Sequence, residues 1–184
     1  IGTDGGGLNK FDREGEQFIH YRHDPLNPNS LSDDIIWSIY EDSTGVLWIA
    51  TDNGLNQFDR EQNQFIHYQH DPHNPESLSK DYVMSLYEDR AGALWIGTDG
   101  GGLNKFDRRR DKFKHYFHEQ QTPNRLSDNL VSSIYQDQKG FLWVGTFAGL
   151  NKFDPNRQKI THYFHDLQNP HSLSDNEIWS IYED

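Results

Sequence analysis

The sequence contains no cysteine, which excludes disulfide bonds and thiolate chemistry. No apolar run approaches the roughly 20 residues that a membrane-spanning helix needs, so we expect no membrane insertion. Basic residues are also scarce, because 17 Lys and Arg stand against 29 Asp and Glu, giving a formal net charge of -12. Nucleic acids and anionic membrane surfaces would repel such a chain, so neither is expected as a partner.

The chain is polar but rich in aromatic residues. Its mean hydropathy of -0.94, taken alone, would favour disorder. However, 14% of the residues are Phe, Trp or Tyr, a fraction that disordered chains do not reach. Large rings at regular spacing bury much area per residue. A chain of 184 residues is also one ordinary domain by length, so we predict a single folded domain, residues 1–184, with an aromatic core.

Internal repetition is the main signal in the sequence. Equivalent leucines recur at Leu8, Leu55, Leu103 and Leu150, with steps of 47, 48 and 47 residues. The repeat units are residues 36–82, 83–130 and 131–177, with a fourth unit made of residues 1–35 together with 178–184. A period of 40 to 50 residues built from short strands is typical of propeller blades, whereas helical repeats are shorter.

Each unit reads as four short strands joined by tight turns. In residues 36–82 we predict strands at 36–41, 47–51, 55–58 and 64–70, with Gly45 and Gly54 in the turns. Acidic residues before Ile35 also allow a helix over 35–41, but the β-branched content favours a strand. A short helical turn at 31–34 leading into that strand would reconcile both signals. The predicted fold is an all-β propeller of four four-stranded antiparallel blades.

Candidate catalytic and metal-binding residues do not form recognisable sites. Two histidines of each unit stand three residues apart, which places them on opposite faces of a strand, and equivalents in neighbouring blades are too distant to share an ion. We interpret these histidines as packing residues; they are His20, His23, His67, His70, His115, His118, His162 and His165. Asp42 and Gly45 lie in a turn that lacks the alternating acids of a calcium loop. No acid–base pair or nucleophile elbow is evident, so we expect neither enzymatic activity nor a cofactor.

The motif I-x-S-I-Y-E-D-x-x-G-x-L-W-I-G-T-x-x-G-L-N-x-F-D resembles the two-component regulator propeller repeat and covers the whole chain. The copies depart from it at Ala50, Gln136, Phe147 and Ala148. The resemblance implies blades of seven-bladed propellers, often paired, in the periplasmic sensor regions of hybrid histidine kinases. It also implies a periplasmic or extracellular location and an association with sensing polysaccharide fragments.

Comparison of the copies separates core positions from variable ones. Tryptophan is kept at Trp48, Trp95 and Trp143, which predicts core packing. A position that opens the innermost strand varies instead; its residues are Trp37, Met84, Ser132 and Trp179. Turns on the same face of a propeller carry Asp4, Asp52, Asp99 and Phe147. These eight residues are our candidate ligand site, an acidic mouth with aromatic walls that suits an oligosaccharide. The alternative is that the variation only adjusts packing in the central channel.

The two chain ends complement each other, because residues 178–184 supply a first strand and the chain opens within a second strand. We therefore expect strands from both ends to complete the terminal blade. We expect two copies that exchange their ends to close an eight-bladed ring as a homodimer, and the alternative is one copy that closes on itself as a four-bladed monomer. The two function classes are a ligand-binding sensor module and a self-assembling structural scaffold without a small-molecule ligand.

Overall fold

The computed structural model describes residues 1–119 and 124–184, and these residues form strands and loops without a helix. Residues 120–123, which belong to the repeat unit predicted over 83–130, lie outside the described residues. The strands are β1 (Leu8–Asp12), β2 (Gln17–Tyr21), β3 (Ile36–Glu41), β4 (Leu47–Thr51), β5 (Gly54–Asp59), β6 (Gln64–Tyr68), β7 (Val83–Glu88), β8 (Leu94–Thr98), β9 (Leu103–Asp107), β10 (Lys112–Tyr116), β11 (Val131–Gln136), β12 (Leu142–Thr146), β13 (Gly149–Phe153) and β14 (Ile160–Tyr163).

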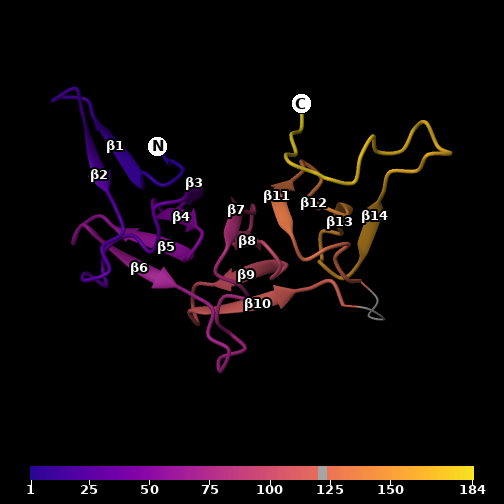
Figure 1. Cartoon of the computed structure of the whole chain (residues 1–184). Coiled ribbons are helices and arrows are strands. Elements are labelled where there is room, and N and C mark those ends of the chain that lie inside the picture. Colours follow the sequence, from indigo (N-terminus) through magenta and orange to yellow (C-terminus); the bar gives the residue numbers. More distant parts are fainter. Residues whose placement is uncertain (120–123) are drawn as a thin grey trace.

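The strands form three four-stranded antiparallel sheets, which we call blade 2 (β3–β6), blade 3 (β7–β10) and blade 4 (β11–β14). Strands β1 and β2 form a two-stranded sheet, the terminal hairpin. Figure 1 shows the sheets fanned into an open arc, with the first strand of each blade on the inside and the chain ends at opposite ends of the arc. The prediction of an all-β propeller architecture is confirmed.

The predicted strand limits of blade 2 are close to those observed. The first two strands coincide with β3 and β4, whereas β5 is one residue longer at each end and β6 ends at Tyr68. The helical alternative over 35–41 is wrong, because residues 36–41 pair with β4. The helical turn expected at 31–34 is also absent, since Ser32 and Asp34 lie in bends and their neighbours form no regular structure.

The first strand of each blade contains a bulge. Pairing with the second strand shifts register between Ile36 and Ser38 in β3, and the same shift recurs in β7 and β11. The extra residues at these shifts are Trp37, Met84 and Ser132. A bulge places one residue outside the ladder and redirects its side chain. This explains why the position tolerates Trp, Met and Ser while its neighbours in the repeat are kept.

The hydrophobic core lies between successive blades. Trp48 is 2% exposed and Trp95 is fully buried, as predicted. The Trp48 ring lies 5.5 Å from Phe106 of blade 3, so Trp48 packs against the blade that follows its own. Trp143 is only partly buried, and its indole nitrogen still bonds to Asp137. The core prediction therefore holds fully for two of the three tryptophans.

An aspartate–tryptophan pair organises the first turn of each blade. Asp42 accepts a hydrogen bond from Trp48 Nε1 at 2.7 Å with one oxygen and bonds from the backbone of Thr44 and Val46 with the other. Burial alone would raise the pKa of Asp42, but the hydrogen bonds from Thr44, Trp48 and Val46 outweigh it and lower the pKa. These bonds use the carboxylate oxygens internally, in agreement with a structural turn.

The histidines fasten the long loops to the outer strands. His70 Nδ1 lies 2.9 Å from the carbonyl oxygen of Leu78, and the same bond recurs at His23, His118 and His165. His67 Nε2 lies 2.6 Å from the carbonyl oxygen of Ser30, so this ring holds the preceding loop. Within the described residues, His, Asp and Glu side chains form no group suited to a metal ion. These contacts agree with our interpretation of the histidines as structural.

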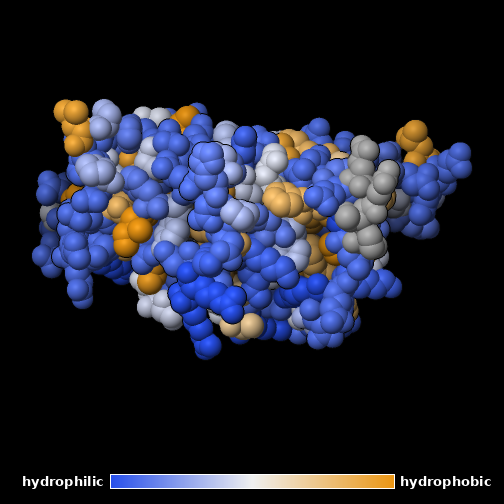
Figure 2. Space-filling view, turned by 90° about the horizontal axis from the view of Figure 1, so that it is seen from below, coloured by the Kyte–Doolittle hydropathy of each residue, from blue (hydrophilic) through white to orange (hydrophobic). Residues whose placement is uncertain are grey.

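The chain ends occupy partial blade positions. Residues 178–184 form no strand, yet Ile178 N bonds to Thr146 O at 3.0 Å, as Ile36 N bonds to Thr3 O at 3.0 Å. The completed terminal blade stays a prediction, because the ends lie far apart along the arc (Figure 1). Seen from below, the arc presents a mainly hydrophilic surface with scattered apolar side chains (Figure 2).

Candidate functional site

The turns that carry the predicted acidic residues are fixed by the repeat itself. In blade 2, Thr51 Oγ1 donates to Gly54 O at 2.8 Å, closing the turn around Asp52. Gly54 has a φ of 110°, and a Cβ atom there would come within 2.7 Å of Tyr68 O. Gly54 N in turn bonds to Asp81 O at 2.7 Å. Each turn is therefore held beside the end of the long loop that enters the next blade.

Trp37 is the centre of the candidate site. Its indole Nε1 donates to Asp52 Oδ1 at 2.6 Å, and its ring lies 5.4 Å from the ring of Tyr82 at an angle of 38°. The side chain remains 45% exposed. The bulge on β3 explains this combination, because it turns Trp37 out of the ladder while the turn supplies a carboxylate to fix the ring. An exposed indole with a fixed orientation is suited to stack against a ligand.

Tyr82 contacts two of the predicted residues, Trp37 and Asp99. Burial raises the pKa of its hydroxyl, and the negative charges of Asp52, Asp99 and Asp4 raise it further. Asp99 N also bonds to Tyr82 O at 2.9 Å. Three of the predicted acids thus lie within electrostatic reach of one phenol. Our sequence analysis did not include Tyr82.

A sequence signal for Tyr82 did exist. Its repeat position holds Ile35, Leu130 and Glu177 in the other copies, so it varies as strongly as the position of Trp37. It also directly precedes the first strand, where the long loop ends. A search for positions that vary between repeats and also lie beside the turn would have identified Tyr82.

The remaining predicted residues belong to blades 3 and 4 and to the C-terminal residues. Phe147 and Trp179 have ring centroids 4.8 Å apart, and Trp179 is 64% exposed. The hydroxyl of Ser132 donates to the carbonyl of Ile178. Met84 is partly buried as the extra residue of β7. These contacts therefore form two groups, one around Tyr82 and one of Phe147 with Trp179, and ligand binding at either group stays a prediction.

The group around Tyr82 combines hydrogen-bond acceptors with aromatic surface. Carboxylates at Asp4, Asp52 and Asp99 repel anions and accept hydrogen bonds from hydroxyl groups. The rings of Trp37 and Tyr82 offer apolar surface. Such a surface favours neutral polyols or cations over acidic ligands.

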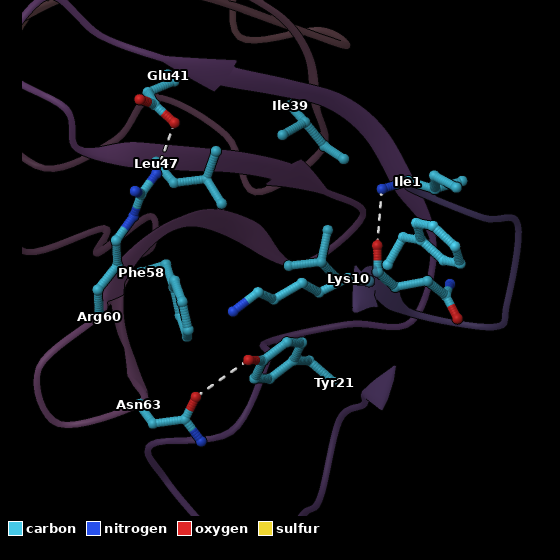
Figure 3. Close-up of a pocket in the computed structure, with 12 residues that line it drawn as sticks. Ile1, Lys10, Tyr21, Ile39, Glu41, Leu47, Phe58, Arg60 and Asn63 are labelled. Atoms are coloured by element: carbon cyan, nitrogen blue, oxygen red, sulfur yellow. Dashed lines mark hydrogen bonds and ion pairs between the residues drawn. The ribbon is translucent and has the colours of Figure 1, made fainter. Parts of the chain in front are cut away.

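A cavity of about 530 Å³ lies elsewhere, between the terminal hairpin and blade 2. Figure 3 shows Lys10, Tyr21 and Phe58 pointing toward one another across it, with Arg60 paired to Glu41 at its edge. Other lining residues are Ile1, Leu8, Ile39 and Leu47. None of the eight predicted ligand-site residues lines this cavity, so it is separate from the candidate mouth.

Comparison with known proteins supports the blade assignment. The family described as two component regulator propeller matches residues 30–53, 77–100 and 125–148, the same stretch of three successive repeats. No curated protein matches the chain in sequence. Within the described residues, no helix is long and apolar enough to cross a membrane.

Solved structures with a similar fold include two extracellular domains from B. thetaiotaomicron. That of BT4673, described as a hybrid two-component system, is 25% identical with a TM-score of 0.79, and covers 98% of this chain and 23% of its own. That of BT3049, described likewise, is 26% identical with a TM-score of 0.73, and covers 100% of this chain and 29% of its own. The chain thus spans about a quarter of the length of these neighbours.

Virginiamycin B lyase from Staphylococcus aureus shares the fold at 16% identity, with a TM-score of 0.60 and coverage of 86% of this chain and 48% of its own. At that identity the likeness concerns the fold alone. The matches at equivalent places in successive blades, together with the similar extracellular domains, lead to one conclusion: the chain contains three two-component regulator propeller repeats.

Proposed function

We propose that this chain is a non-enzymatic propeller module of a sensor region outside the cytoplasm, and that it binds a neutral oligosaccharide at the mouth around Trp37 and Tyr82. The main support for this proposal is the exposed ring of Trp37. Its Nε1 donates a hydrogen bond to Asp52 Oδ1 at 2.6 Å, and the ring packs near that of Tyr82. The extracellular domains of similar fold support the sensor class and the location. In this proposal the repeated residues build the blades, and the side chains at the mouth contact the ligand.

The recognition would work through stacking and hydroxyl hydrogen bonds. Sugar rings present apolar faces that pack on Trp37 and Tyr82, while Asp52 and Asp99 accept bonds from the hydroxyl groups. The cluster of negative charge disfavours uronic acids and sulfated glycans. Affinity would be modest, because an open mouth encloses little ligand surface.

A glycan array probed with the intact chain tests this proposal. Wild-type protein should retain neutral glycans, and the combined change Trp37→Ala with Trp179→Ala should abolish retention. Both rings are more than two fifths exposed, with 45% and 64% of their surface free, so the melting temperature should change little. Phe117→Ala, which removes an aromatic ring that is 38% exposed on the outer strand side, is the matched control and should still bind.

The opposite results are equally clear. If the intact chain retains no glycan on a broad array, or retains only acidic glycans, the oligosaccharide proposal is wrong. Retention by the double Trp variant would place the binding surface elsewhere.

The second candidate is a structural, self-assembling propeller without a small-molecule ligand. It is favoured by the exposed aromatic side chains at both ends of the arc, including Phe11 and Phe18 at 48% each. Exposed apolar surface of this kind marks an interaction site. An array without any bound glycan, together with stable self-association, would favour this candidate over the sensor.

A further inference from the structure

An aromatic trio is repeated at the junctions between blades. Tyr68 of blade 2 lies 5.2 Å from Phe106 and 5.8 Å from Phe113 of blade 3, and the two phenylalanines lie 4.9 Å apart. The junction between the terminal hairpin and blade 2 has the same distances with Tyr21, Phe58 and Phe65. These two junctions are therefore built from one tyrosine and the phenylalanine pair of the following blade, whereas at the junction of blades 3 and 4 Tyr116 packs on Phe153, with Ile160 in place of the second phenylalanine.

The two ends of the arc carry the separate halves of such a junction. Phe11 and Phe18 of the terminal hairpin form a pair at 5.2 Å, and each is 48% exposed. At the other end, Tyr163 of blade 4 is 40% exposed and stacks on Trp143 at 5.6 Å. A groove of about 620 Å³, lined by Trp143, Tyr163 and Leu150, opens there. One end thus offers the phenylalanine pair and the other offers the surface that such a pair covers elsewhere.

The C-terminal residues are already positioned as the first strand of a further blade. Residues 178–184 read IWSIYED, identical to residues 36–42. Glu183 accepts hydrogen bonds from Tyr135 at 3.1 Å and from the Gln138 backbone at 3.0 Å. Glu88, at the equivalent position, accepts a backbone bond from Ser43 of the preceding blade in the same way. Blade 4 therefore holds residues 178–184 as blade 2 holds β7.

The opposite end exposes the surface against which such a strand would pack. Ile39 on β3 is 37% exposed, whereas its equivalents Leu86 and Ile134 are 8% exposed each. Within the arc, β7 packs against both β3 and β11, so an inner strand normally has neighbours on both sides. The cavity of about 530 Å³ adjoins Ile39 on this side (Figure 3).

The charges at the two ends also match. Arg108 bridges Asp42 at 2.8 Å and Glu88 at 3.0 Å, linking blades 2 and 3. Arg60 occupies the same position one blade earlier, lines the cavity and bonds to Glu41 at 2.5 Å. The residue that corresponds to Asp42 in this earlier junction is Asp184, at the far end of the arc.

We propose that a second copy of this chain covers both ends, closing a two-fold ring of eight blades. Phe11 and Phe18 of one copy pack on the partner's Tyr163, and residues 178–184 lie along the partner's β3. Arg60 bonds to the partner's Asp184. A head-to-tail contact either closes or polymerises, and an arc whose ends carry matching halves closes with two copies when each contributes half of the turn. The interface shares Trp179 with the candidate ligand site, but Phe11, Phe18 and Arg60 do not belong to that site, so variants at these residues test the dimer without changing the proposed sugar-binding residues.

Mass in solution is the first test. Light scattering at micromolar concentration should give twice the 21.6 kDa of one chain. Phe11→Ser combined with Phe18→Ser should give 21.6 kDa with an unchanged circular dichroism spectrum, because both rings are half exposed in the single chain. Ile66→Ser is the matched control, since Ile66 is 47% exposed on β6 away from these faces, and it should remain dimeric.

A charge exchange is the second test. Arg60→Asp and Asp184→Arg should each raise the dimer dissociation constant about tenfold or more, and the two changes together should restore most of the affinity. Arg110→Asp, on an exposed turn, should leave the dissociation constant unchanged. Wild-type protein at 21.6 kDa, open polymers, or a double variant no tighter than the single ones would each overturn the proposal.

Discussion

Replacing Trp95 by alanine tests the inter-blade core most directly. The side chain is fully buried, and its Nε1 donates to Asp89 Oδ2 at 2.8 Å. Its ring lies 5.5 Å from that of Tyr116, with the ammonium of Lys105 at 5.3 Å from its centroid. Truncation removes the ring contacts and leaves a cavity that blade 4 can fill only partly. Large-to-small changes of this kind cost about 3–5 kcal/mol.

The loss of the hydrogen bond can be separated from the loss of the ring. Trp95→Phe keeps most of the apolar surface but removes the donor to Asp89, whose side chain is only 5% exposed. A hydrogen bond to a charged group contributes about 1.5–3 kcal/mol, so the phenylalanine variant should lose roughly half as much as the alanine variant.

Urea unfolding followed by circular dichroism measures both losses without using tryptophan fluorescence. With a slope near 2 kcal/mol/M, Trp95→Ala should lower the midpoint by about 2 M. Trp37→Ala is the control, because that ring is 45% exposed, and its midpoint should move by less than about 0.5 M. A loss below about 1 kcal/mol for Trp95→Ala would show that the inter-blade core does not depend on this ring.

Three further changes follow from the repeated contacts. Asp42 has a lowered pKa, so its contribution to stability is present above its usual value of 3.8 and is lost as the pH falls below it; Asp42→Asn should flatten the acid limb of a stability-against-pH curve. His70→Ala should cost about 1 kcal/mol in urea unfolding by removing the bond to Leu78 O, whereas His73→Ala on the same loop should be neutral. Gly97→Ala should lower the melting temperature, because a Cβ atom there meets Val131 O at 2.6 Å, and an unchanged value would contradict this close approach.

The sequence predicted the blades because their signals are local and repeated. Hairpin glycines, β-branched residues and the 47-residue period all act within one unit, so strand limits came out within two residues. The bulge at Trp37 could not be predicted in this way. It depends on the pairing of β3 with β4, where the register shifts between Ile36 and Ser38, and a strict period of two does not describe it.

The candidate site was predicted only in part, for a related reason. Repeat comparison identifies positions one at a time, so it found Trp37 and Asp52 as variable or turn residues. The contact between Trp37 and Tyr82 joins the first strand of one blade to the loop entering the next, and this spacing is set by blade packing. Trp143 shows the same limit, because its repeat position indicates a core residue while its partial exposure depends on what lies beyond blade 4.

The substitution of Ala50 for glycine shows how the blades adjust to one another. Ala50 is fully buried at the position of Gly97 and Gly145, where a Cβ atom would lie 2.6 Å from atoms of Val131 and Ile178, respectively. The repeat pattern treats Ala and Gly there as equivalent, yet the inner strands of blades 3 and 4 leave no room for a methyl group. In blade 2 the methyl group of Ala50 is buried in a core cluster that includes Val83, the first residue of β7. The room for a side chain at this position therefore differs from one junction to the next, so the packing between neighbouring inner strands depends on small residues that the repeat motif treats as interchangeable.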